Sequence, residues 1–380
     1  MAAIGPRFGF GLYVHWPYCA RICPYCDFNV YAAKDRESAP LLDAMVKDLA
    51  AHRTWLTDHP SLDSIFFGGG TPSLLNPLDL SRLVQAAQKT FGLTETAEIT
   101  LEANPNDINP SQLDGWKAAG INRLSIGVQS LNDGALSFLG RDHDSARARA
   151  AIAQVRPVFD DFSIDLIYAR PGQTNADWQQ ELTEALDLGA PHLSLYELTI
   201  EDRTAFGKRA ARGELMPLPD DDQADLYEVT QRLCDARGLA AYEVSNHAKA
   251  SDYESRHNHI YWASGDWIGI GPGAHGRLTV DGQRYATEAA RRPADYLNGM
   301  PTARYQLSST DTAREFLAMA LRPIAGLDLN RFEQLFGRTI DARVLTDLRE
   351  NGLGTVVQDA LVLSPSGRLM ADHIASLLDP

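Results

Sequence analysis

Short apolar runs alternate with longer amphipathic stretches from the N-terminus to about residue 240. Short runs are typical of buried strands, and apolar residues at helical spacing are typical of helices. The predicted strands are Leu12–His15, Ser64–Phe67, Glu98–Leu101, Arg123–Gly127, Ser163–Ile167 and His192–Tyr196. The predicted helices are Leu41–Trp55, Leu78–Phe91, Gln112–Ala118, Ser145–Val155 and Trp178–Leu188. This alternation predicts an α/β fold with parallel strands, and six units favour a partial (β/α)6 barrel over an open doubly wound sheet.

The pattern changes after about residue 245. The segment Asp252–Gly276 is rich in Gly, His and Trp and is expected to be irregular. Helical patterns return at Thr312–Leu321 and Asn330–Phe336, and Ala360–Leu369 is expected to form two short strands around a Ser-Pro-Ser-Gly turn. We therefore expect three parts: a core at 1–245, a connecting segment at 246–304, and a smaller, winged-helix-like α+β domain at 305–380.

Composition and charge narrow the range of functions. The chain has 380 residues, 44% of them apolar, so it can bury one large core and a smaller one. Its net charge of −15 argues against binding to nucleic acid or to an anionic membrane surface, which both need clustered Lys and Arg. No apolar run approaches the length of a membrane span, and Met1–Gly11 lacks a signal-peptide pattern. We expect a cytoplasmic protein that is not an integral membrane protein.

Three of the four cysteines lie close together. Cys19, Cys23 and Cys26 form a C-x3-C-x2-C loop directly after the first predicted strand, whereas disulfide frameworks spread their cysteines along a chain. Most iron–sulfur clusters use four cysteines, so three thiolates would leave one iron open to a small molecule. A zinc site that also uses His15 is the alternative, although no second cysteine pair is present. Cys234 lies in a helical pattern and is expected to be a half-buried structural residue.

Polar and glycine residues follow or interrupt several predicted strands. Gly68–Pro72 comes directly after the second strand, Glu102 and Gln129 end the next two, and Arg141 follows downstream. Asp165 interrupts an apolar run, where a carboxylate is costly unless it is paired. Each has a purely structural interpretation, such as a strand cap, a surface cation or an Arg141–carboxylate pair. Because ligands of parallel α/β folds bind at strand C-termini, we expect one pocket to collect these residues.

The cysteine spacing resembles that of the radical SAM superfamily. The resemblance implies a [4Fe–4S] cluster on the three cysteines, with the open iron chelated by S-adenosylmethionine (SAM). Reductive cleavage of SAM would then give a 5′-deoxyadenosyl radical, with the cofactor carrying the radical chemistry. The residues implied to contact SAM are Tyr13, Gly69, Gly70, Thr71, Glu102, Gln129, Arg141 and Asp165.

Further motifs indicate a branch of this superfamily. The stretches GGGTP, LEANP, GVQS, LGRDH and IDLIYARPGQT occur in the order seen in oxygen-independent coproporphyrinogen III dehydrogenase and its relatives. Phe28 stands where the dehydrogenase has a further cysteine, and only eighteen residues precede Cys19. Both departures resemble the HemW family of heme chaperones. The segment 257–262 fits the H-N-x-x-Y-W pattern of that family, which implies His257 as an axial heme ligand, with His259 and His275 as competitors. The alternative for His257 is a hydrogen-bonded structural residue.

The resemblance implies heme binding and delivery to acceptor hemoproteins such as membrane respiratory enzymes. A dimer is possible, no nucleic-acid partner is expected, and no catalytic residue is assigned. The alternative function is oxidative decarboxylation of coproporphyrinogen III. A zinc-stabilised structural protein is a third interpretation. Phe28, the short N-terminal segment and the H-N-x-x-Y-W motif favour the chaperone.

Overall fold

The computed structural model describes residues 8–32, 38–56 and 58–379, so the start of the segment inspected for a signal peptide lies outside it. Neighbouring parallel strands form the centre of a curved sheet, in the order β11-β1-β4-β5-β6-β7-β8. They are β1 (Phe10–Trp16), β4 (Leu62–Gly69), β5 (Leu93–Ala103), β6 (Arg123–Gln129), β7 (Phe162–Tyr168), β8 (His192–Glu197) and β11 (Asp266–Ile270). All six predicted strands are confirmed within them.

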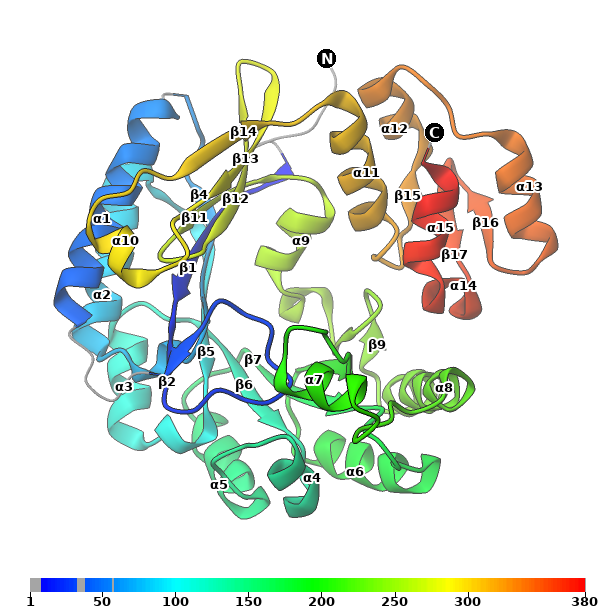
Figure 1. Cartoon of the computed structure of the whole chain (residues 1–380), viewed down its shortest axis with the longest axis horizontal. Coiled ribbons are helices and arrows are strands. Elements are labelled where there is room, and N and C mark those ends of the chain that lie inside the picture. The colour runs from blue at the N-terminus through cyan, green and yellow to red at the C-terminus, as the bar shows by residue number, and fades with distance from the viewer. Residues whose placement is uncertain (1–7, 33–37, 57, 380) are drawn as a thin grey trace.

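Helices cover the outer, convex side of this sheet, as in a partial barrel (Figure 1). They are α1 (Ser38–Trp55), α2 (Pro77–Phe91), α3 (Pro110–Ala118), α4 (Asp133–Phe138), α5 (Ser145–Val155), α6 (Asn175–Asp187) and α8 (Asp220–Ala236). The five predicted helices are confirmed among them. Helix α2 shows why such segments form: Asn76 caps its first turn, Pro77 begins it, and Gly92 ends it at a φ of 78°.

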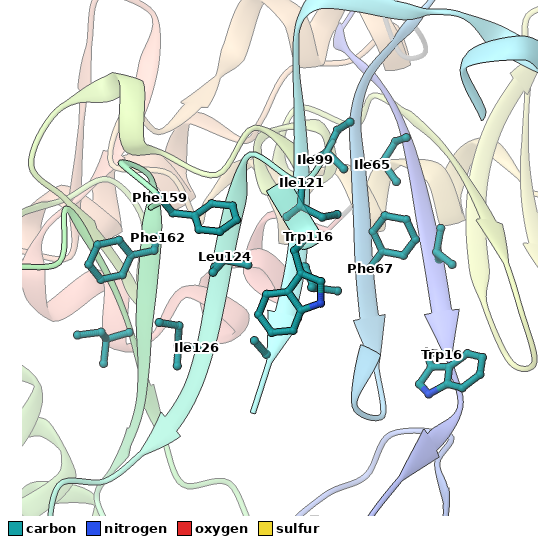
Figure 2. Packing of buried hydrophobic residues seen from close by; sticks show 14 of the residues in the cluster. Trp16, Ile65, Phe67, Ile99, Trp116, Ile121, Leu124, Ile126, Phe159 and Phe162 are labelled. Carbon is teal, nitrogen blue, oxygen red and sulfur yellow. The ribbon is translucent and has the colours of Figure 1, made fainter. Parts of the chain in front are cut away.

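Strand β6 shows how the sheet separates its two faces. Leu124, Ile126 and Val128 are completely buried on the convex side. Figure 2 shows Leu124 and Ile126 in the layer that also contains Trp116 of α3. The alternate residues of the strand face the concave side, because successive side chains of a strand point to opposite faces. The concave side is therefore the polar one.

The segment expected to be irregular is largely ordered, which corrects that prediction. It contains α9 (Arg256–Trp262), β11 and the start of β12 (His275–Val280). The Ser255 side chain caps α9 by accepting a hydrogen bond from the Asn258 backbone, and β11 pairs in parallel with β1, more than two hundred residues earlier in the chain. Helix α9 packs against β4, β1 and β11 and closes one end of the concave space.

Short elements complete the sheet and its surroundings. Strands β12, β13 and β14 extend one edge and β10 and β9 the other, in antiparallel pairings, while β2 and β3 pair separately within the N-terminal loop. The bounds not yet given are β2 (Tyr18–Cys19), β3 (Tyr31–Ala32), α7 (Ala205–Ala211), β9 (Ala240–Ala241), β10 (Asn246–Ala248), β13 (Gln283–Glu288), α10 (Pro293–Leu297) and β14 (Ala303–Gln306).

The C-terminal part is an α+β module with its own apolar core. Its elements are α11 (Ser309–Ala320), β15 (Leu327–Asp328), α12 (Leu329–Phe336), α13 (Ala342–Glu350), β16 (Gly354–Val357), β17 (Ala360–Leu363), α14 (Pro365–Leu369) and α15 (Ala371–Leu378). The two helices predicted here are confirmed. The hairpin prediction was wrong, because Ser364 caps a helix and Pro365 begins it, so only β17 comes from that segment. The true hairpin joins β16 to β17.

Among the described residues, no helix combines the length and the apolar character that a membrane crossing needs.

Candidate functional site

A cavity of about 590 Å³ occupies the concave side of the sheet. It runs from the cysteine loop, beyond the C-terminal end of β1, to helix α9. Every residue predicted from the sequence to bind a cluster, SAM or heme lines it: Tyr13, Cys19, Cys23, Cys26, Gly69, Gly70, Thr71, Glu102, Gln129, Arg141, Asp165 and His257. The expectation that strand ends collect these residues in one pocket is met.

The cysteine loop presents three cysteine side chains, none of them in a disulfide, to the cavity. A turn closed by a bond from the Cys26 amide to the Cys23 carbonyl (3.1 Å) shapes the loop. Burial raises the pKa of Cys26 to about 11, and the neighbouring Cys23 and Cys19 add to the effect. Arg141 Nη1 lies 3.4 Å from Cys23 Sγ and is the nearby cation. Thiols in this environment need a positively charged partner to ionise, which an iron–sulfur core supplies.

The zinc alternative has little geometric support. Among residues 8–32, 38–56 and 58–379, no group of three or more His, Cys, Asp or Glu side chains is placed to hold a single metal ion. His15, the expected fourth zinc ligand, instead contacts the Tyr13 hydroxyl through Nδ1 (2.9 Å) and the Asn29 carbonyl through Nε2 (3.0 Å). A zinc ion draws its ligands to about 2.0–2.3 Å from one point, whereas a four-iron core holds its thiolates farther apart. Three thiols on one loop therefore fit a cluster better than zinc.

The glycine turn after β4 is tied to the base of the cysteine loop. The Gly70 amide donates to the Trp16 carbonyl (2.7 Å), and the Thr71 amide donates to the Tyr18 carbonyl (2.9 Å). Gly69 has a φ of 106°, and a Cβ on Gly70 would lie 2.6 Å from the Tyr18 carbonyl oxygen. Only glycine fits such a turn, and without side chains its backbone can come close to a ligand in the cavity.

Two half-buried carboxylates face the cavity from β5 and β7. Glu102 accepts a hydrogen bond from the Gly69 amide (3.1 Å), and its pKa is raised to about 8, mainly by burial and then by the charge of Asp165. Asp165 accepts from Ser125 Oγ (2.6 Å) and Ser163 Oγ (2.8 Å), and burial raises its pKa as well. Hydroxyl donors therefore satisfy Asp165, and the Arg141–carboxylate pair considered from the sequence is not what stabilises it.

Gln129 and Arg141 carry polar atoms without partners. Gln129 has a φ of 68°, unusual for a residue other than glycine, and strain of this kind concentrates at functional sites. Gln129 Oε1 and Arg141 Nε are buried and have no hydrogen-bond partner within the described structure. Arg141 Nη2 donates to the Gly127 carbonyl (2.9 Å), which fixes the guanidinium beside the cavity. These open groups, with the two carboxylates, fit the ribose hydroxyls, ammonium and carboxylate of SAM.

The H-N-x-x-Y-W motif lies on α9. His257 is 1% exposed, and its ring contacts Ser64 Oγ through Nδ1 (2.7 Å) and the Tyr261 hydroxyl through Nε2 (2.6 Å). Burial lowers its pKa to about 3, so the imidazole is neutral. His259 is partly exposed and paired with Glu254 (2.7 Å). His275 begins β12 and is exposed, away from the cavity lining.

Sequence reasoning missed part of the lining. Thr100, Ser125, His192, Ser194, Tyr196 and Tyr261 also face the cavity. The sequence pattern that could have predicted these residues is present in β6. There, fully buried aliphatic residues alternate with Arg123, Ser125, Gly127 and Gln129, which line the cavity. Cys234, expected to be half-buried, is completely buried in the main core.

Known protein families match both the barrel and the C-terminal module of this chain. Residues 13–185 match the radical SAM superfamily, and residues 307–370 match the HemN C-terminal domain. "Heme chaperone HemW" of Bacillus subtilis (strain 168) is 33% identical over 374 residues, or 95% of this chain and 97% of that protein. The mitochondrial "Radical S-adenosyl methionine domain-containing protein 1" of Dictyostelium discoideum is 36% identical over 96% of this chain and 93% of that protein.

A solved structure shares the fold over almost the whole chain. It is that of the coproporphyrinogen III oxidase HemN of Escherichia coli, described as a radical SAM enzyme, with a TM-score of 0.82. The match covers 98% of this chain and 90% of that one at 23% sequence identity. At this identity the likeness establishes the fold.

Proposed function

Because the chain belongs to the HemW family of the radical SAM superfamily, we propose that it is a heme chaperone with a SAM-ligated [4Fe–4S] cluster. One observation carries the proposal: a single cavity is lined at one end by the cysteine loop and at the other by α9 with its H-N-x-x-Y-W motif. Residues suited to a cluster, to SAM and to heme thus share one space.

Each group of lining residues has a role in this proposal. Cys19, Cys23 and Cys26 would hold three irons of the cluster and leave the fourth open to SAM. The glycine turn and the carboxylates of Glu102 and Asp165 accept or orient the SAM ammonium and ribose hydroxyls, while Arg141 and Gln129 face its carboxylate. When bound, the cluster supplies the electron for reductive SAM cleavage. The remaining SAM contacts come from Tyr13, Gly69, Gly70 and Thr71.

We place the heme ligand at His257, since imidazole is a common axial ligand of heme iron. His257 Nε2 is engaged with the Tyr261 hydroxyl at 2.6 Å, so ligation requires that hydrogen bond to open. Tyr261 of the same helix lines the cavity and provides aromatic surface for a flat macrocycle, whereas Trp262 is buried against Tyr242 and His259 outside the lining. Delivery to acceptor hemoproteins, including membrane respiratory enzymes, and assembly as a dimer belong to the same proposal.

A heme titration tests the ligand. Wild-type protein should give a Soret band at about one heme per chain, and His257→Ala should lose it. Tyr261→Phe should bind heme about fivefold more tightly, because it frees Nε2 from a hydrogen bond worth about 1 kcal/mol. His259→Ala and His275→Ala are the matched controls and should keep the band. A Soret band that survives in His257→Ala and disappears in one of the controls would assign the heme ligand to that control residue instead of to His257.

The rival function is coproporphyrinogen III decarboxylation, which the fold shared with HemN would accommodate. Phe28, 59% exposed at the cavity lining, replaces the thiol expected of the dehydrogenase with a side chain that has no acid–base or redox chemistry. Reconstituted protein with SAM and reductant should therefore give no decarboxylated product, as measured by chromatography of the porphyrins. Sustained turnover at a rate typical of enzymes, on the order of 1 per second or faster, would restore the rival.

A further inference from the structure

A chain of buried hydrogen bonds leads out of the cavity from Asp165. Ser163 Oγ lies 2.8 Å from Asp165 Oδ1, and His192 Nδ1 lies 2.9 Å from Ser163 Oγ. His192 Nε2 lies 2.8 Å from the Tyr242 hydroxyl, which lies 3.1 Å from the Ser255 backbone nitrogen. Ser163, His192 and Ser255 are all nearly inaccessible to solvent. The chain thus joins a cavity carboxylate to the residue that caps α9.

The direction of each hydrogen bond in this series follows from its two ends, the Asp165 carboxylate, which can only accept, and the Ser255 amide, which can only donate. Ser163 donates to the carboxylate, so its oxygen accepts from His192, and Nδ1 carries the ring hydrogen. Nε2 then accepts from the Tyr242 hydroxyl, whose oxygen accepts the Ser255 amide hydrogen. Burial lowers the pKa of His192 well below its usual value, so the ring is neutral and carries a single ring hydrogen, on Nδ1. Every donor in the chain points toward Asp165.

Tyr242 is also where the C-terminal module meets the barrel. The Ile324 amide donates to the Tyr242 carbonyl (3.0 Å), and Arg322 pairs with the adjacent Glu243 (3.0 Å). Arg331 of α12 donates to the carbonyl of Ala263, which follows the last residue of α9. Helix α9 is therefore held at its N-terminus by Tyr242 and by Glu98, which accepts from the Arg256 and His257 amides (3.0 and 3.2 Å), and at its C-terminus by the module.

We propose that His192 and Tyr242 are positioning residues of a relay that couples ligand occupancy at Asp165 to α9. The proposal rests on the proposed function, in which SAM is that ligand. Ribose hydroxyls that donate to Asp165 replace Ser163 as its donor. Ser163 then turns its hydrogen to Ser194 Oγ (3.0 Å), a neutral acceptor, and its oxygen accepts less strongly from His192 Nδ1, because the bonds of such a chain polarise one another. His192 Nε2 in turn accepts less strongly from the Tyr242 hydroxyl, so the bond from the Ser255 amide that holds the start of α9 weakens.

Hydrogen exchange of the full chain, with its cluster reconstituted under anaerobic conditions, tests the relay. Saturating SAM should speed exchange of the Ser255 amide at least about fivefold in the wild type, the lower end of typical coupling. Tyr242→Phe keeps the ring but cannot donate to His192, and should abolish this response. Ser163→Ala interrupts the chain at its other end and should do the same, so the relay can still be tested if one of the two variants fails to fold.

Tyr296→Phe is the matched control. Its hydroxyl also accepts a backbone amide, from Gly271 (3.0 Å), and donates to a buried side chain, Asp48 (2.8 Å), but it lies outside the cavity lining. This variant should respond to SAM as the wild type does. A response that persists in Tyr242→Phe, or no wild-type response although SAM perturbs the EPR signal of the reduced cluster, would overturn the relay alone. An unchanged EPR signal would overturn SAM ligation, and the relay with it.

Discussion

Replacement of Cys23 by alanine is expected to abolish the iron–sulfur cluster, and the same result is expected for Cys19 and Cys26. Each thiolate would hold one iron of a core that already lacks a fourth protein ligand, and no other cysteine lines the cavity among the described residues. After anaerobic reconstitution, wild-type protein should contain about four irons and four sulfides per chain and absorb broadly in the visible range. The three variants should contain neither.

Cys234→Ala is the matched control for the cluster variants. Cys234 lies on α8 in the main core, so its replacement costs some stability through lost packing and leaves the cluster intact. Wild-type protein that is purified without oxygen and contains zinc in place of iron would contradict the assignment.

Glu102→Gln should weaken SAM binding and stabilise the empty protein at alkaline pH. At pH 9, where Glu102 is ionised, the variant lacks the charge-assisted hydrogen bonds of the carboxylate, so the SAM dissociation constant should rise roughly 10- to 100-fold. The pKa of Glu102 is about 8 in the folded protein and 4.5 in a model peptide. As the pH rises from 4.5 to 8, the unfolded chain ionises at Glu102 while the folded protein stays protonated, so wild-type stability falls across this interval.

Denaturant unfolding at pH 5 and pH 9 measures this effect. The variant should match the wild type near pH 5 and exceed it by an amount on the order of 4 kcal/mol at pH 9. Glu181→Gln is the contrasting control, because Glu181 is buried but paired with Arg170, and its replacement should destabilise the protein at neutral pH. Equal stabilities of Glu102→Gln and wild type at pH 9 would contradict the assigned environment of Glu102.

The sequence predicted elements whose signals are local and missed those whose partners are distant. The alternation that predicted the six strands and five helices reflects which side chains each element buries. Strand β11 lacks a local pattern of this kind, because it forms by pairing with β1, which is distant in the sequence. Its residues were therefore predicted to be irregular. The β16–β17 hairpin turns at Gln358 and Asp359, both with positive φ, where the usual Asn-Gly or Asp-Gly signal is absent.

The sequence was enough to predict which residues line the candidate site, but not which atoms those residues contact. Strand-end positions and motif order were enough to select residues that share one cavity. The sequence could not indicate that both ring nitrogens of His257 are hydrogen-bonded, because Ser64 and Tyr261 reach it from different elements. Nor could it indicate that Asp165 is satisfied by serine hydroxyls rather than by a guanidinium.

The position of β11 beside β1 has a consequence for synthesis of the chain on the ribosome. Strands β1 and β4 to β8 can pair once about two hundred residues have emerged, and N-terminal units fold first during translation. Helix α9 and β11 arrive only after residue 255, so the nascent barrel exposes one end of its lumen and one edge of β1 until then. An unpaired edge invites association with other chains. The last third of the polypeptide thus shields the nascent barrel from aggregation as well as completing the site.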